Sequence, residues 1–200
     1  MVHSEVADIV ALAPGQERSA IALSREAGWN QTEADWRFFL ELGEVFAVER
    51  DGMLAATAAI MPYGVNFAWI GMVLTRKRFR GQGFGTALLN HCIAWLDALG
   101  RVALLDATPL GEPLYRKLGF APIEGWARWN GRQGGAPRQR RIEDTASAID
   151  LDRQAFGANR SKLLLHFVAR SHFSLSTPDG SCFLRDGDLA WQIGPISARS

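Results

Sequence analysis

The sequence predicts an α/β fold in which a mixed, mostly antiparallel sheet is flanked by helices. Asp51-Gly52, a strong hairpin signal, separates two β-type runs, so antiparallel strands are expected on either side of it. A strand, a helix and another strand then follow within residues 67–105, and this order implies a right-handed crossover with parallel pairing. Three glycines at alternate positions join that strand to that helix, in Arg80-Gly81-Gln82-Gly83-Phe84-Gly85-Thr86.

Apolar periodicity and turn residues give the order of the elements. Pro14 opens a first helix that Gly28 ends, and Thr32-Glu33-Ala34-Asp35 resembles a capping box at the start of a second helix. A helix with one buried stripe runs from Ala87 and is closed by Gly100. Strands are expected at 45–48, 54–60, 67–75, 102–105 and 120–129, the last as an exit strand, with a turn at 62–64 and a short helix at 111–118.

Composition excludes several classes of protein. The 200 residues are 48% hydrophobic, which is enough for a core, and the net charge of +1 gives no global attraction to nucleic acid or to a membrane. Cys92 and Cys182 have no metal or redox spacing and are interpreted as reduced, packed thiols. The four histidines have no metal-ligand spacing, so no metal is expected. No apolar run suits a membrane span or signal peptide, and we expect a cytoplasmic protein.

The glycine loop predicts an anion site. Glycines let backbone N–H groups converge, and the following helix adds its unpaired N-terminal donors and the positive end of its dipole. The basic run from Arg76 to Arg80 next to the loop has three interpretations: a solvated strand end, a contact to ligand phosphates, or a nucleic-acid contact.

Two motifs together resemble the GNAT superfamily of acyl-CoA-dependent N-acetyltransferases. They are Arg80-x-x-Gly83-x-Gly85, which follows Met72-Val73-Leu74-Thr75, and Leu114-Tyr115-x-x-Leu118-Gly119-Phe120. The resemblance covers roughly residues 31 to 130, and it implies acetyl-CoA as co-substrate. It implies that the backbone of Val73, Leu74 and Thr75 pairs with the pantetheine arm, and that one amide, that of Leu74, polarises the thioester carbonyl. It places the coenzyme A pyrophosphate on Arg80, Gly81, Gln82, Gly83, Phe84, Gly85 and Thr86.

The resemblance also implies catalytic roles. Tyr115 matches the position of the general acid that protonates the departing thiolate, and a phenol with a pKa of about 10 suits that task at neutral pH. Trp69 stands where histone acetyltransferases have a glutamate base. Asp106, which follows the strand after the loop helix, is the leading substitute, although it also suits a local turn. Glu33 and Asp35 are weaker candidates that a helix cap explains equally well.

The rest of the chain predicts a second, incomplete copy of the same fold. Residues 1–131 are interpreted as the acetyltransferase domain, 132–141 as a linker and 142–200 as a partial second domain. In that domain two helices, at 142–156 and 161–169, precede three short strands. Ala190-Trp191-Gln192-Ile193-Gly194 corresponds to Ala68-Trp69-Ile70-Gly71 with one residue inserted. So short a unit buries too little surface to stand alone, and we expect it to dock on the first domain or on another chain.

Three functions follow from these patterns. The leading hypothesis is transfer of an acetyl group from acetyl-CoA to a primary amine of a small molecule or peptide, by direct attack in a ternary complex. The alternative is a non-catalytic acyl-CoA-binding or regulatory module. A dinucleotide-binding domain fits less well, because Thr86 replaces the third glycine and a meander precedes the loop. Neither a nucleic acid nor a membrane is expected as a partner, and a homodimer remains open.

Overall fold

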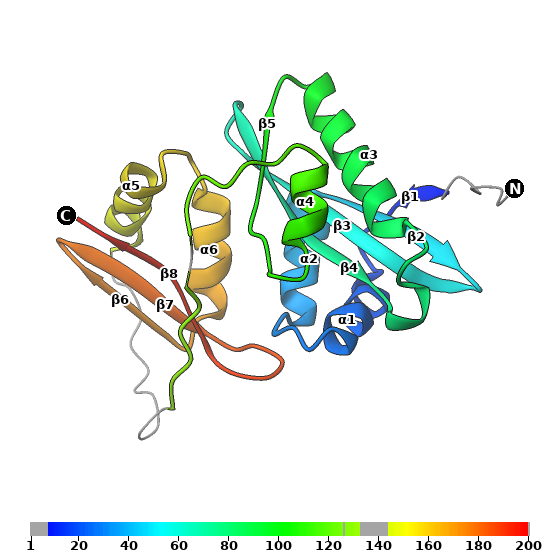
Figure 1. Ribbon diagram of the computed structural model, residues 1–200. Coiled ribbons are helices and arrows are strands. Elements are labelled where there is room, and N and C mark those ends of the chain that lie inside the picture. The colour runs from blue at the N-terminus through cyan, green and yellow to red at the C-terminus, as the bar shows by residue number, and fades with distance from the viewer. Residues whose placement is uncertain (1–7, 126, 133–143, 200) are drawn as a thin grey trace, which may run out of the picture.

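A computed structural model describes residues 8–125, 127–132 and 144–199 of the chain. It contains two sheets, one of five strands in order β1-β2-β3-β4-β5 and one of three strands in order β6-β7-β8. We define the N-terminal unit as residues 8–125 and the C-terminal unit as residues 144–199, and Figure 1 shows them side by side. The expected mixed α/β class, with a mostly antiparallel sheet flanked by helices, is confirmed.

The five-stranded sheet is antiparallel except at one edge. Each of the first three strands pairs antiparallel with the next, as the hairpin at Asp51-Gly52 predicts, and β5 pairs parallel with β4. The helix between those two strands makes the crossover that parallel pairing requires. The strands are β1 (Ile9–Ala11), β2 (Glu44–Arg50), β3 (Met53–Tyr63), β4 (Phe67–Thr75) and β5 (Val102–Leu105).

Helices cover both faces of this sheet. On one face α3 packs through Leu88, Leu89, Cys92 and Leu96, and on the other face α1 and α2 pack around the fully buried Trp36. The indole N–H of Trp36 donates to Ser24 Oγ at 2.9 Å, so its one polar atom is satisfied. The helices of this unit are α1 (Glu17–Glu26), α2 (Glu33–Leu42), the 3₁₀ turn η1 (Lys77–Phe79), α3 (Phe84–Ala98) and α4 (Glu112–Lys117).

Two helix starts differ from the sequence-based bounds. Pro14 lies in a turn before α1, which begins only at Glu17, because Gly15 has a φ of +99° that interrupts helical geometry. Helix α3 begins at Phe84 instead of Ala87, because Gly83, with a φ of +83°, is its N-cap. The last three residues of the glycine loop are therefore the first turn of α3.

The expected exit strand at 120–129 is wrong. Its described residues form no strand, and Ile123 and Trp129 are 84% and 90% exposed. Pro122 lacks the N–H that a ladder needs, and Gly125 adds a second break. Two large apolar residues are not enough to form a strand where no neighbouring strand or core receives them.

The C-terminal unit repeats the order of two helices followed by an antiparallel meander. Its elements are α5 (Thr145–Phe156), α6 (Ser161–Arg170), β6 (Phe173–Thr177), β7 (Gly180–Arg185) and β8 (Gln192–Ala198). The ladder of β7 and β8 has a register irregularity between Cys182 and Leu184, as the ladder of β3 and β4 has between Thr57 and Ala59. The linker expected at 132–141 lies, apart from residue 132, outside the described residues.

The C-terminal unit docks on the N-terminal unit through fixed charges. The Arg170 guanidinium donates to Asp35 Oδ1 at 2.6 Å, to Thr32 Oγ1 at 2.8 Å and to Asp186 at 3.2 Å. Asp35 also completes the capping box of α2 with Thr32. One arginine of α6 is therefore tied to the start of α2.

Further contacts join the C-terminal unit to the end of α1 and to the turn between α1 and α2. Arg25 forms a bidentate pair with Asp188 at 2.7 and 3.1 Å, and the Asn30 side chain accepts from the N–H groups of Leu189 and Ala190. Aromatic contacts extend the interface, because Phe38 packs on His166 with ring centroids 4.9 Å apart. The expectation of docking on the first unit is confirmed.

We predict that Arg170→Ala destabilises the protein by about 3 kcal/mol, because it leaves the largely buried Asp35 carboxylate without its cation. Urea unfolding measures this change. Arg153→Ala is the control, since its pair with Asp150 is exposed and should contribute no more than about 0.5 kcal/mol. Equal losses in the two variants would contradict a structural role for the Arg170 contacts.

Candidate functional site

The parallel pairing of β4 and β5 ends before β4 does. Residues 67–70 of β4 pair with residues 102–105 of β5, where β5 stops, and β4 continues alone to Thr75. The backbone of residues 71–75 therefore has an edge that no described strand occupies. An extended ligand can add to such an edge as a further strand.

A β-bulge lies at the point where the two strands separate. Thr57 pairs with Leu74 and Ala59 with Gly71, so Met72 and Val73 together face one residue of β3. Met72 has a φ of +51°, a conformation that costs a non-glycine residue about 1 kcal/mol or more. The hydroxyl of the fully buried Thr57 donates to the Met72 carbonyl at 2.9 Å and holds this conformation.

Hydrogen-bond alternation determines which amides face the open edge. Arg76 N–H donates to Ala55 of β3, and hydrogen-bonded pairs recur at every second residue of an antiparallel ladder. Leu74 N–H therefore points toward β3, while the N–H groups of Val73 and Thr75 point away from it. This alternation favours Val73 over Leu74, the residue expected from the sequence, as the amide that faces the open edge.

The glycine loop presents a row of unpaired donors. In the part of the chain that the structure describes, none of the N–H groups of residues 81–86 has a hydrogen-bond acceptor. Gly81 and Gly83 have φ values of +76° and +83°, and a Cβ added at either would lie in open space. Gly85 lies beside the end of β4, since its Cβ would stand 3.6 Å from Thr75 Oγ1. The loop and the open edge form one continuous surface.

Apolar side chains anchor the glycine loop to the core. Phe79 and Phe84 are buried against the core on the α3 face, with ring centroids 6.3 Å apart. Phe84 thus offers only its backbone to a ligand. Burial of these two rings anchors the loop while Gly81, Gln82 and Gly83 remain exposed.

The basic run divides between structural and exposed roles. Arg76 donates to Glu26 at 2.8 Å and to the Leu54 carbonyl at 2.7 Å, and Arg78 pairs with Asp51 at 3.1 Å. Arg80 is exposed and its Nε donates to the Thr75 carbonyl at 3.3 Å, which keeps it beside the open edge. Arg76 therefore belongs to the scaffold, and Arg80 is available near the loop.

Tyr115 lies on the α3 face of the sheet. It packs at the margin of the same apolar cluster as Val73, with its ring against Phe120 at 6.3 Å between centroids. The ring also covers Gly111, where an added Cβ would stand 2.8 Å from a ring carbon. Burial raises the pKa of Tyr115 above its ordinary value of 10, so the phenol keeps its proton at neutral pH.

Asp106 lies on the opposite face. Its Oδ2 accepts from the Trp69 indole N–H at 3.2 Å, and the residue is exposed just beyond the end of β5. The other carboxylates considered have structural partners, since Asp35 caps α2 and binds Arg170, and Glu33 lies 3.7 Å from Arg18 on the surface. The two catalytic candidates from the sequence, Tyr115 and Asp106, thus flank the separated strands from opposite sides of the sheet.

The described residues contain no group of three or more His, Cys, Asp or Glu side chains that could hold a metal ion. No helix among them is long and apolar enough to cross a membrane. Both cysteines are free thiols, and burial raises the pKa of Cys92 to about 12, as expected of a packed thiol.

The candidate site consists of the separated strands β4 and β5, the glycine loop with its unpaired amides, and the helix that follows the loop. A family comparison agrees with this geometry. Residues 13–120 match the acetyltransferase (GNAT) family. The chain belongs to this family. The GNAT match spans the five-stranded sheet after β1, together with α1 to α4. No curated protein matches the chain in sequence.

Solved structures share the GNAT fold at low sequence identity. A candidate acetyltransferase from Pyrococcus horikoshii is 18% identical, with a TM-score of 0.73, over 98% of this chain and 72% of that one. A glucosamine-6-phosphate N-acetyltransferase from Arabidopsis thaliana is 20% identical with a TM-score of 0.52, over 63% of this chain and 99% of its own. At these identities the similarity supports the fold alone. The first of these structures extends the shared architecture to the C-terminal unit.

Sequence reasoning missed two residues of this site. In the sequence Thr57 is an ordinary β-branched strand residue. No pattern indicates that its hydroxyl bonds to the Met72 carbonyl, 15 residues away. Met72 has no turn residue beside it except Gly71, so its left-handed conformation has no sequence signal. Both follow from the pairing of distant strands.

We predict that Thr57→Val lowers the free energy of unfolding by about 1 to 3 kcal/mol, because the buried Met72 carbonyl loses its donor without any change in side-chain volume. Hydrogen exchange of the Leu74 and Arg76 amides, which point toward β3, should become faster. Thr57→Ser, the control, keeps the hydroxyl and should keep these amides protected. Unchanged stability and exchange in Thr57→Val would contradict the role of this hydrogen bond.

Proposed function

We propose that the chain transfers an acetyl group from acetyl-CoA to a primary amine by direct attack in a ternary complex. The row of unpaired amides at residues 81–86 carries this proposal, because an anion placed there can accept from several of these N–H groups. A pyrophosphate suits this row, since the N-terminal end of α3 also contributes its positive dipole. Arg80 adds an exposed positive charge beside the loop.

The open edge of β4 supports the binding of a pantetheine arm. The amide groups of the pantetheine arm pair with the N–H and C=O groups of residues 71–75, as a neighbouring strand would. The thioester then lies near the bulge, where the Val73 N–H is the favoured donor to the oxygen that gains negative charge. One such donor contributes about 3 kcal/mol to transition-state stabilisation in other acyl-transfer enzymes.

The chemistry requires one proton to leave the amine and one to reach the thiolate. The amine nitrogen attacks the carbonyl carbon, and the C–S bond breaks as the carbonyl re-forms. Asp106, directly or through water, accepts the amine proton on its face of the sheet, and Tyr115 donates its phenol proton to the thiolate on the α3 face. Asp106 then releases its proton to water, and water returns a proton to Tyr115, which restores both side chains.

An acyl-CoA-binding module without catalysis is the alternative. Asp106 favours it, because this exposed carboxylate already accepts a hydrogen bond from the Trp69 indole. Release of free thiol from acetyl-CoA with a panel of amines distinguishes the two functions. Binding of acetyl-CoA without release would identify the module.

We predict that Gly83→Ala weakens acetyl-CoA binding at least about 10-fold, because the methyl group enters the open space in front of the amides and φ moves from its positive value. Isothermal titration calorimetry measures this affinity. Gly100→Ala is the matched control, with a φ of +63° and open space at the far end of α3. Both variants lose about 1 kcal/mol of stability, but only the first should lose affinity.

The wild-type protein should be stabilised by acetyl-CoA, by about 2.7 kcal/mol at 100 times the dissociation constant, and not by NAD or ATP. Stabilisation by NAD alone would overturn the proposal.

We predict that Tyr115→Phe binds acetyl-CoA normally and lowers kcat about 100-fold. Because burial raises the pKa of this phenol above 10, the wild-type kcat should fall only above pH 10, as the proton needed for the thiolate is lost. The variant should lack this basic limb. An unchanged pH profile of kcat, measured where chemistry limits the rate, would show that another group is the acid.

A further inference from the structure

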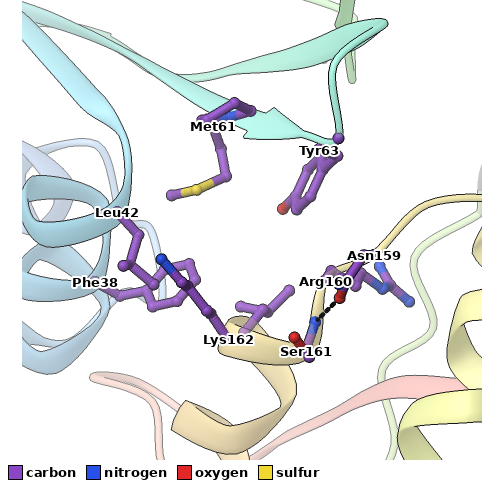
Figure 2. A pocket seen from close by; sticks show the side chains of 11 residues that line it. Phe38, Leu42, Met61, Tyr63, Asn159, Arg160, Ser161 and Lys162 are labelled. Atoms are coloured by element: carbon purple, nitrogen blue, oxygen red, sulfur yellow. Dashed lines mark hydrogen bonds between the residues drawn. The ribbon is translucent and has the colours of Figure 1, made fainter.

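A pocket of about 310 Å³ lies between the two units (Figure 2). Phe38, Leu42 and Met61 of the N-terminal unit form an apolar wall, and residues 159–163 at the start of α6 form the opposite wall. Figure 2 shows the Tyr63 hydroxyl and the Lys162 amine directed into this space. The Ser161 N–H donates to Asn159 Oδ1 at 2.9 Å, which fixes the first turn of α6 beside it.

The charge of this pocket is positive. Two of its lining residues, Arg160 and Lys162, are cations, and none is a carboxylate. Arg160 is already neutralised, because it binds the buried Asp152 at 2.7 and 2.8 Å and stacks on Phe156. Lys162 has no ion pair or hydrogen bond among the residues that the structure describes. An anion entering the pocket would therefore meet one uncompensated ammonium group and the Tyr63 hydroxyl.

The pocket lies on the Asp106 face of the sheet. Met61 pairs with Trp69, which pairs in turn with Leu104 of β5, and the Trp69 indole holds Asp106. Two strand spacings separate β3 from β5, so the pocket wall lies about 10 Å from the proposed base. Phe156 covers the surface between them, since its ring lies 5.2 Å from Tyr63 and 6.4 Å from Trp69. Both units thus border the route along which an amine would extend.

We propose that this pocket binds the anionic end of the acceptor, an elongated amine that carries a carboxylate or phosphate about 10 Å from its nitrogen. The inference rests on the proposed acetyl transfer. The amine lies at Asp106, the chain of the acceptor crosses Trp69 and Phe156, and Lys162 binds the anion. The C-terminal unit then selects the substrate, and Lys162 is a specificity-determining residue.

The test compares 8-aminooctanoate, whose extended chain separates its amine and carboxylate by about this distance, with its uncharged carboxamide and with the shorter 4-aminobutanoate. Thiol release from acetyl-CoA gives kcat/KM for each. We expect 8-aminooctanoate to exceed both others at least about 10-fold, a difference of about 1.4 kcal/mol. Lys162→Ala should remove the preference for the carboxylate while leaving kcat/KM for the carboxamide and the affinity for acetyl-CoA unchanged.

Arg153→Ala is the matched control, because it removes a positive charge from the C-terminal unit outside the pocket. It should keep the full preference. A further substrate, 8-aminooctyl phosphate, carries a phosphate in place of the carboxylate and shows which anion is preferred. A preference for either anion over the carboxamide supports the proposal if that preference depends on Lys162.

If the wild-type protein uses the carboxamide as well as both the carboxylate and the phosphate, or if the preference for an anion survives in Lys162→Ala, the inference is overturned while acetyl transfer stands. If no amine is acetylated, calorimetry measures the binding of N-acetyl-8-aminooctanoate in the presence of coenzyme A. The inference is overturned if this compound does not bind, or if it binds the wild-type protein and Lys162→Ala equally well. Failure to bind acetyl-CoA would instead refute the proposed function itself.

Discussion

The site depends on one interruption in the five-stranded sheet, where β4 separates from β5 after the pair of Ile70 and Leu105. The bulge at Met72 lies just beyond this point, and the buried Thr57 hydroxyl satisfies the carbonyl that the bulge displaces. Because β5 ends at Leu105, the backbone of residues 71–75 stays open beside the glycine loop, where the proposed acyl carrier would add as a strand.

The two proposed catalytic residues lie on different faces of the sheet. Tyr115 packs with Val73 on the α3 face, in apolar surroundings that keep its phenol protonated. Asp106 lies on the other face with Trp69, in an exposed position that suits a carboxylate. In the proposed reaction the acid and the base therefore act from opposite faces of the sheet.

The C-terminal unit gives the second face a boundary that the GNAT match alone does not include. Arg170 and Asn30 fix the unit against the start of α2 and the turn before it. Phe156 then packs on the aromatic residues at the paired end of β4. These contacts are polar at the rim and aromatic near the sheet, so the interface both orients the unit and keeps an open pocket within it.

The sequence by itself determined the local elements and the nature of the anion site, because glycine conformation, helix periodicity and hairpin turns are short-range properties. The sequence predicted the bounds of β4 and β5 and their parallel pairing correctly, and it identified the glycine loop whose last residues form the first turn of α3. Only the tertiary structure decided the bulge at Met72, the direction of the Leu74 amide, the loss of the strand at 120–129 and the pocket beside Lys162. Each of these depends on which distant strand or unit lies next to a residue, and hydrogen bonding and burial between distant segments leave no periodic signal in the chain.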